Sequence, residues 1–270
     1  MKYKVGDFVK VLDKGYIKLV DVMGSDEEIC TAARVSYHEK STKKVNEDKG
    51  LIDHLLRHRH TSPFEMGEMK FEIKLPIVVE RQWVRHRTCS MNEMSGRYSE
   101  MPEEYYEPAE YREQAKDNKQ GSDGDLVITP EFLVRKGQTM NQTWEEYHEM
   151  IEMGVSREMA RNDLPLSTYT KKVWKMDLHN LFHFLKLRTD SHAQWEIRQY
   201  ADHMERFVEA NFPWSYASWK NHIKDAVILS ADEIGIFTDA LTDKWMIGRI
   251  DKLEISKTRK LELKAKLGLT

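Results

Sequence analysis

Apolar and polar residues alternate along short segments of the chain, and this period of two predicts β-strands. Residues 8–12, 16–22 and 69–75 show the alternation. Residues 168–176 are rich in β-forming residues and are expected to form a further strand. The sequence therefore predicts a few short strands, two near the start of the chain and two much further along it.

Elsewhere apolar residues recur every three or four positions, which is the spacing of a helix with one buried face. Ser25 and Glu28 form a capping box, which predicts a helix from about Ile29. The polar, turn-rich run at 112–125 is expected to be an exposed loop. Further helices are predicted at about residues 51–59, 130–154, 156–164, 177–188, 193–210 and 252–267.

Composition narrows the range of functions. Charged residues make up 32% and hydrophobic residues 40% of the 270 positions, as in soluble globular proteins. A net charge of −3 argues against a general nucleic-acid coat, and no apolar run is long enough to span a membrane. The two cysteines, Cys30 and Cys89, form no disulfide framework, which favours a reducing, cytoplasmic location.

The stretch from Arg81 to Tyr98, RQWVRHRTCSMNEMSGRY, concentrates guanidinium groups, hydroxyls and a glycine in eighteen positions. A helix opened by Pro76 is expected to run through Arg85 to Cys89, followed by a loop at residues 91–97. Arginine matches phosphate, carboxylate and uracil-like edges with a planar fork of donors. A solvated, charged helix end is the simpler interpretation, but the density of these residues favours a small anionic ligand.

Two local patterns allow more than one interpretation. Ser62-Pro63-Phe64-Glu65 is either a second capping box or a tight turn that presents polar groups to a ligand. His179 and His183 have the spacing of metal ligands on a helix, but no third ligand is evident, so no metal is predicted. The chain has neither a Gly-rich dinucleotide fingerprint after a strand nor a P-loop.

The chain resembles the flavin-dependent thymidylate synthases. Their signature, Arg-His-Arg followed after seven residues by Ser, is complete here as Arg85-His86-Arg87 and Ser95. Other segments resemble the family in the same order: AARVS at 32–36, HTSPFE at 60–65, ARNDLPLSTYT at 160–170, LRTDSHAQWEIRQYA at 187–201 and FPW at 212–214. The resemblance covers roughly residues 16–220.

The resemblance implies a fold, a reaction and an assembly. The fold is α+β, a single domain with a small, mostly antiparallel sheet packed against several long helices. Residues 1–220 would form this domain and residues 221–270 a C-terminal helical extension. The reaction is the reductive methylation of dUMP to dTMP, with methylenetetrahydrofolate as carbon donor and FAD, reduced by NADPH, as hydride donor. The assembly is a homotetramer whose active sites are shared between subunits.

The family's functional residues carry over to positions of this chain. Arg188 and Ser95 are expected to be catalytic, Arg188 at the uracil edge and Ser95 as an orienting hydroxyl. The implied dUMP-binding set is Gln82, Arg85, Glu93, Ser95, Gly96, Arg97, Arg161 and Arg188. The implied FAD-binding set is Ser36, His60, Ser62, Arg85, His86, Arg87, Glu93, Asp177, His179 and His183.

The chain departs from the family pattern at a few positions. Met66 stands where a histidine is common, and Asp177 and His179 stand where asparagine and arginine are common. An acid beside a flavin phosphate would repel it, so Asp177 is expected to accept from a flavin or ribose donor instead.

Three other functions compete with this interpretation. A cysteine-dependent thymidylate synthase would use Cys89, which lacks that family's Pro-Cys-His setting. A nucleic-acid-binding module is disfavoured by the acidic charge balance. The third is a homologue that binds nucleotide and flavin but is inactive.

Overall fold

A five-stranded antiparallel sheet forms the centre of the computed structural model, in the order β1-β2-β3-β7-β4. The structure describes residues 3–37, 45–116, 121–230, 232–234, 243–267 and 269. β3 and β7 pair along their full length, from Glu68 opposite Asp177 to Pro76 opposite Tyr169. The strands are β1 (Phe8–Val11), β2 (Gly15–Met23), β3 (Glu68–Pro76), β4 (Ser90–Glu93) and β7 (Tyr169–Asp177).

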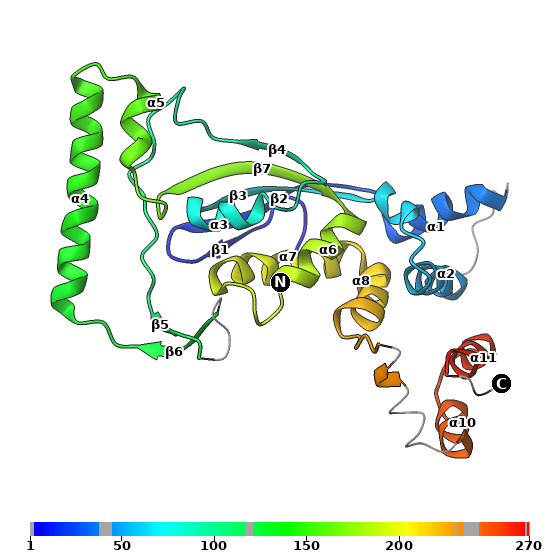
Figure 1. Ribbon diagram of the computed structural model, residues 1–270. Coiled ribbons are helices and arrows are strands. Elements are labelled where there is room, and N and C mark those ends of the chain that lie inside the picture. Colours follow the sequence, from blue (N-terminus) through cyan, green and yellow to red (C-terminus); the bar gives the residue numbers. More distant parts are fainter. Residues whose placement is uncertain are drawn as a thin grey trace. The chain divides into compact units, whose positions relative to one another are not determined.

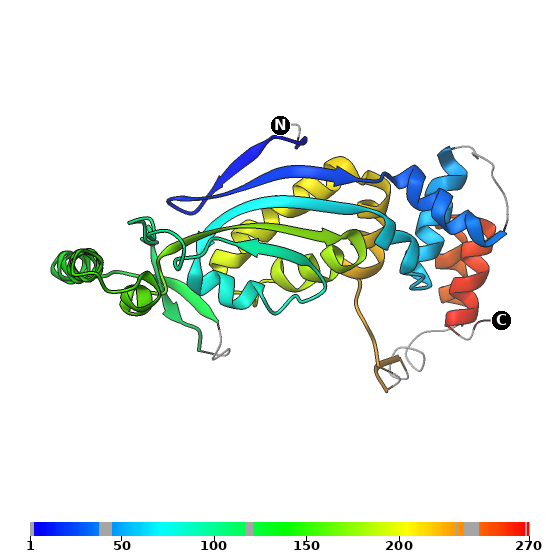
Figure 2. The ribbon, with the colours of Figure 1, turned by 90° about the horizontal axis from the view of Figure 1, so that it is seen from above.

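The main core lies between one face of this sheet and two helices, α6 (Leu178–Arg188) and α7 (Trp195–Asn211) (Figure 1). Alternate residues of β3, from Met69 to Leu75, are fully buried, as a strand with one covered face requires. The view from above shows α7 running beneath the strands (Figure 2). The predicted α+β class with an antiparallel sheet is therefore confirmed.

The segment after β2 forms α1 (Asp26–Arg34), η1 (Val35–Tyr37), α2 (Val45–Arg57) and the 3₁₀ helix η2 (Ser62–Met66). The Ser25 hydroxyl accepts from the Glu28 amide, so the predicted cap is correct, although the helix begins three residues before Ile29. Of the two interpretations of residues 62–65, the capping box is wrong. Thr61 precedes η2 without a side-chain capping bond, and Ser62 begins this short 3₁₀ helix, with Pro63 as its second residue.

The helix predicted to reach Cys89 is shorter than expected. α3 (Ile77–Trp83) ends before Arg85, and the segment predicted as a loop at residues 91–97 begins instead with β4. Ser90 to Glu93 pair with Lys175 to Lys172 of β7. Hydrogen bonds to the edge of β7 satisfy the backbone N–H and C=O groups of this segment. The helix therefore ends before the chain reaches β4.

Within the run at 112–125, two segments form paired strands and not a loop, and residues 117–120 lie outside the described residues. β5 (Tyr111–Gln114) pairs with β6 (Ser122–Leu126), whose residues are all exposed. Strands without a buried face have no alternating apolar pattern, which explains why periodicity did not predict these two strands.

Beyond the hairpin, α4 (Pro130–Glu152) begins at the Thr129 cap, as predicted, and lies apart from the sheet in both ribbon views (Figures 1 and 2). Trp144 and Tyr147 of α4 pack with Met101 and Ala160 in a second, smaller core. Ala160 ends α5 (Arg157–Ala160), and η3 (Arg161–Asp163) connects α5 to the segment before β7.

The described chain divides by contacts into two units, Met1–Lys224 and Asp225–Thr270. The first unit ends with α8 (Pro213–Trp219) and the π-helical turn η4 (Lys220–Lys224). The second contains α10 (Asp243–Asp251) and α11 (Lys257–Lys266), which share a small core of Met246, Ile250 and Leu269. The tail helix predicted from residue 252 therefore starts later, at the cap that Ser256 provides.

None of the helices in the described part of the chain is both long and apolar enough to cross a membrane.

Candidate functional site

Arg188, the last residue of α6, is held by two acceptors from the segment around the end of α3. Its Nε donates to Nε2 of His86 at 3.0 Å, and its Nη2 donates to the backbone carbonyl of Gln82 at 3.2 Å. A cation is also favoured at a helix C-terminus, where the backbone carbonyls lack partners. These contacts join residues that lie more than one hundred positions apart and fix the guanidinium plane.

His86 must be neutral to accept this bond. Burial, together with the positive charge of Arg188, lowers the pKa of His86 from the ordinary 6.5 to about 4. Burial also lowers the pKa of Arg188. At neutral pH the imidazole therefore offers a lone pair at Nε2, and Arg188 keeps its positive charge in a partly desolvated position.

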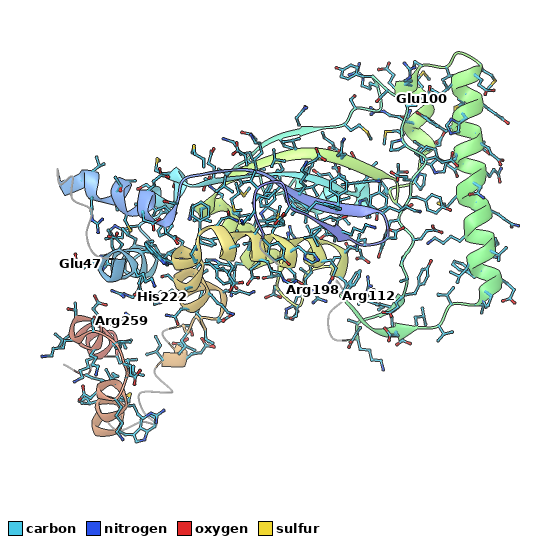
Figure 3. The ribbon with its side chains drawn as sticks, turned by 180° about the vertical axis from the view of Figure 1, so that it is seen from behind. Glu47, Glu100, Arg112, Arg198, His222 and Arg259 are labelled. Atoms are coloured by element: carbon cyan, nitrogen blue, oxygen red, sulfur yellow. The ribbon has the colours of Figure 1, made fainter. Side chains whose placement is uncertain are left out.

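A cavity of about 960 Å³ lies beside this cluster. Gln82 and Arg188 line it on one side, and the β5–β6 hairpin lines it on another. Figure 3 labels Arg112 and Arg198, which both line this cavity and lie close together in the view. Two predicted site residues, Gln82 and Arg188, thus lie on the wall of one polar cavity.

Several side chains of this cavity were not singled out from the sequence. Glu196, only 4% exposed, accepts from Arg112 and, at 2.8 Å, from Nε2 of Gln194. Gln194 in turn accepts from the amide of Gln82. Two of these residues, Gln194 and Glu196, lie in the family-like segment at 187–201, which was the available signal for them.

A second cavity, of about 270 Å³, shares Arg188 with the first. It is lined by four of the predicted flavin contacts, Arg85, His86, Arg87 and His183. Asn180, which the sequence did not indicate, also lines it. This cavity therefore combines guanidinium and imidazole groups, which suits an anionic ligand.

A third cavity, of about 170 Å³, lies next to the second, and His183 lines both. His60 and His179 also line it, among apolar side chains that include Phe182 and Trp219. Ser36 and Ser62 are exposed in the short helices η1 and η2. These placements spread the predicted flavin residues over two adjoining cavities and the nearby helices.

Asp177 has a local structural role. As the cap of α6, it accepts from the backbone amide of Asn180 at 2.9 Å and from the side-chain amide at 2.7 Å. Both carboxylate oxygens are thus engaged at the helix N-terminus, where a negative charge is favoured.

The remaining predicted dUMP residues are Glu93, which ends β4, then Ser95, Gly96 and Arg97, which follow it, and Arg161, which begins η3. Glu93 accepts from the Thr170 hydroxyl at 2.7 Å, and the Ser95 hydroxyl accepts from the Arg97 amide at 3.3 Å. Arg97 forms an exposed ion pair with Glu158 at 3.1 Å.

Gly96 brings the backbone close to Arg161. A Cβ at this position would lie 2.7 Å from Sδ of Met101 and 3.1 Å from Cδ of Arg161, so only glycine fits without a shift. Within one chain, Arg97, Gly96 and Arg161 therefore contact other residues than Arg188 does.

Residues 18–214 match the protein family described as thymidylate synthase complementing protein. A flavin-dependent thymidylate synthase of Thermus thermophilus is 52% identical over 234 residues, which cover 87% of this chain and 86% of that protein. One of Treponema denticola is 47% identical over 240 residues, covering 87% and 90%. The crystal structure of the UMP/dUMP methylase PolB of Streptomyces cacaoi with 5-Br dUMP matches with a TM-score of 0.72 and 31% identity, over 79% of this chain and 97% of that one.

Proposed function

The chain belongs to the thymidylate synthase complementing protein family, whose matched relatives are flavin-dependent thymidylate synthases, and we propose that it converts dUMP to dTMP. In this proposal methylenetetrahydrofolate supplies the carbon, and FAD, reduced by NADPH, supplies the hydride. The observation that carries the proposal is the position of Arg188, which lines two adjoining cavities at once. Hydride transfer needs two ligands in contact, and a side chain shared by two cavities can touch both.

The larger cavity suits the uracil ring. The Gln82 amide and the Arg188 guanidinium provide an acceptor and fixed donors on one wall. Negative charge develops on the ring as carbon 5 becomes nucleophilic, and the fixed cation of Arg188 would stabilise it. His86 and the Gln82 carbonyl hold this guanidinium in place before the substrate arrives.

The phosphate of dUMP is assigned to Arg97 and Arg161, with Ser95 as an orienting hydroxyl. Glu93, Gly96 and Arg85 complete the proposed nucleotide site. Arg97, Gly96 and Arg161 have different surroundings from the Arg188 cluster within one chain. We therefore propose a homotetramer in which the groups from neighbouring subunits meet at one dUMP.

The smaller cavities suit FAD. Arg85 and Arg87 lie exposed on the wall of the second cavity, where they can pair with a diphosphate. His183 and Arg188 contribute further donors there, and His60 and His179 line the third cavity among apolar groups. Bound FAD supplies the hydride that reduces the transferred carbon. The proposed set also includes Ser36, Ser62, His86, Glu93 and Asp177.

No cysteine nucleophile is needed in this proposal. Cys89 is partly buried, and its thiol donates to the carbonyl of His86 at 3.3 Å. Cys89→Ala should therefore keep most of the dTMP-forming activity, within about threefold of the unaltered enzyme, because only one weak hydrogen bond is lost. Loss of all turnover, in protein that retains its fold, would favour a thiolate mechanism.

Flavin content tests the cofactor directly. The purified protein, or protein incubated with FAD, should release one FAD per chain on denaturation, measured by absorbance and chromatography. Arg87→Ala should lower the affinity for FAD, because a guanidinium at the second cavity is lost. Protein that cannot be loaded with FAD would contradict the proposed cofactor.

Finally, we propose that residues 1–220 form the synthase domain and residues 221–270 a helical extension. The family match ends at residue 214, and the two contact units divide after Lys224. Both observations support a boundary in this part of the chain.

A further inference from the structure

A chain of hydrogen bonds leads from the buried carboxylate of Glu196 to the wall of the larger cavity. Gln194 Nε2 donates to Glu196 Oε2 at 2.8 Å, and Gln82 Nε2 donates to Gln194 Oε1. On its other oxygen, Glu196 accepts from Arg112 and, at 3.2 Å, from the Tyr106 hydroxyl. We refer to Glu196, Gln194 and Gln82 as the amide relay.

The carboxylate fixes the direction of every bond in the relay. An ionised carboxylate only accepts hydrogen bonds, so Gln194 must turn its NH₂ group toward Glu196. The carbonyl of Gln194 then faces Gln82, and Gln82 in turn must direct its NH₂ group toward Gln194. A glutamine amide that could otherwise adopt either orientation is thus held in one.

Glu196 is kept ionised by its partners. Burial works against its charge, but hydrogen bonds from Gln194 and Arg112 outweigh burial and lower the pKa of the carboxyl group. Tyr106 remains a donor, because burial and the neighbouring carboxylate raise the pKa of its hydroxyl. Arg112 also stacks on Trp195, 4.9 Å from the ring centroid, which positions its guanidinium.

The fixed amide exposes a defined group to the cavity. Gln82 Nε2 is engaged with Gln194, and in the part of the chain that the structure describes no group donates to Gln82 Oε1. Gln82 lines the cavity together with Arg188, whose guanidinium is a donor only. The wall therefore offers an acceptor next to a donor.

This order of donor and acceptor matches one pyrimidine and mismatches another. Uracil has an N–H donor at position 3 and carbonyl acceptors beside it. Cytosine has an unprotonated nitrogen at position 3 and an amino donor at position 4. An acceptor at Gln82 pairs with uracil N3–H, whereas it faces a lone pair on cytosine N3.

We propose that Glu196 and Gln194 are positioning residues that select uracil over cytosine nucleotides by fixing the amide of Gln82. The proposal rests on the proposed function, because it takes the larger cavity as the site of the pyrimidine ring. A site that fixes its hydrogen-bonding groups rejects an analogue that leaves those groups unpaired.

Glu196→Gln provides the sharpest test, because it should reverse the relay. The new amide must direct its oxygen at the donors Arg112 and Tyr106, so its NH₂ group faces Gln194. Gln194 then turns its NH₂ group toward Gln82, and Gln82 presents its own NH₂ group to the cavity. This reversed orientation suits the lone pair of cytosine N3.

The experiment measures dissociation constants for dUMP and dCMP by titration calorimetry on FAD-loaded protein. We expect the unaltered protein to prefer dUMP by at least tenfold and Glu196→Gln to reduce this preference by roughly tenfold, which corresponds to one hydrogen bond of about 1.4 kcal/mol. Glu110→Gln, which removes an exposed carboxylate outside the cavity, should leave the preference unchanged.

A second variant and a double variant distinguish an effect on the preference for dUMP over dCMP from an effect on folding. Gln194→Leu breaks the relay at an exposed side chain and should also weaken the preference, while Arg112 and Tyr106 still donate to Glu196. In a Gln82→Ala background, Glu196→Gln should no longer change the preference, because the relay acts through Gln82.

The possible outcomes distinguish this proposal from the proposed function. If Glu196→Gln and Gln194→Leu weaken both nucleotides by the same factor, or leave the preference unchanged, the relay has only a structural role and the proposal fails while dUMP binding stands. If the unaltered protein binds neither nucleotide, the proposed function fails, and the proposal about the relay fails with it.

Discussion

At the scale of single residues, the neutral state of His86 determines how Arg188 is held. A protonated imidazole has no lone pair to accept from Arg188 Nε and would repel the guanidinium. The arrangement therefore depends on the low pKa of His86, and this dependence is measurable in the stability of the fold.

His86 should make the protein less stable as the pH falls from 6.5 to 4. In this window the unfolded chain protonates His86, whose ordinary pKa is 6.5, while the folded chain resists until about pH 4. The contribution is fully present above pH 6.5 and is lost on acidification, by on the order of 2 kcal/mol. Urea unfolding of the unaltered protein and of His86→Asn at pH 7 and pH 4.5 measures the difference. An identical pH dependence in the two proteins would contradict the assigned protonation state.

The sequence predicted many site residues because they lie in short, recognisable segments. Arg85-His86-Arg87 and Ser95 are such a case, and the structure places the three basic residues around one cavity. Gln194 and Glu196 were not singled out, although they lie in a recognised segment. Their importance depends on Arg112 and Gln82, which come close only in the folded chain.

At the scale of elements, a buried ion pair ties α3 to β7. Lys172 and Glu80 have side-chain exposures of 0% and 4% and are in direct contact, with Lys172 Nζ also 4.2 Å from the centroid of the Trp83 ring. Burial lowers the pKa of Lys172 and raises that of Glu80. The pair positions the helix that carries Gln82 against the strand that pairs with β4.

Removing one partner of this pair should destabilise the protein strongly. Lys172→Met leaves Glu80 buried and unpaired, which should reduce the free energy of unfolding by about 3–5 kcal/mol. Adding Glu80→Leu should restore most of the loss, because apolar residues then replace both charges. The measurement is chemical denaturation of the single and double variants.

An ion pair between Lys175, also on β7, and Glu68 of β3 provides the control. Lys175 contacts Glu68 at 2.7 Å, but their side chains are 38% and 25% exposed. Lys175→Met should therefore cost less than about 1 kcal/mol. Equal losses for Lys172→Met and Lys175→Met would contradict the argument from burial.

The sequence predicted strands and helices well where one face is buried, and poorly where pairing with a distant strand determines the structure. β3 and α7 carry clear apolar patterns and lie close to where they were expected. The end of α3 and the presence of β4 depend on pairing with β7, which is distant in sequence. β6 is exposed along its whole length and β5 has only two half-buried residues, so neither strand shows alternating apolar residues.

At the scale of the whole molecule, the first unit contains its own core. The buried residues of the main cluster all precede Lys224, from Val11 to Trp219. A chain that ends at Lys224 should therefore fold, and its melting temperature should lie within a few degrees of the full chain. Differential scanning calorimetry on both proteins makes the comparison. Aggregation of the shortened chain would contradict this account of the two units.

The family assigned from the sequence is confirmed by the match over residues 18–214 and by the relatives that share about half of their residues with this chain. The number of subunits could not be derived from residue patterns in the same way. Surfaces between subunits depend on which exposed side chains meet in three dimensions, and single-chain periodicity does not encode that information.

The most direct test of the account is a single-turnover assay without oxygen. FAD-loaded protein is mixed with NADPH, methylenetetrahydrofolate and dUMP, and dTMP is quantified by chromatography while flavin absorbance is followed. We predict dTMP in proportion to active sites, and a decrease of at least about a hundredfold in Arg188→Ala, which removes the cation at the uracil edge. Absence of dTMP from protein that binds both FAD and dUMP would contradict the account and indicate an inactive homologue.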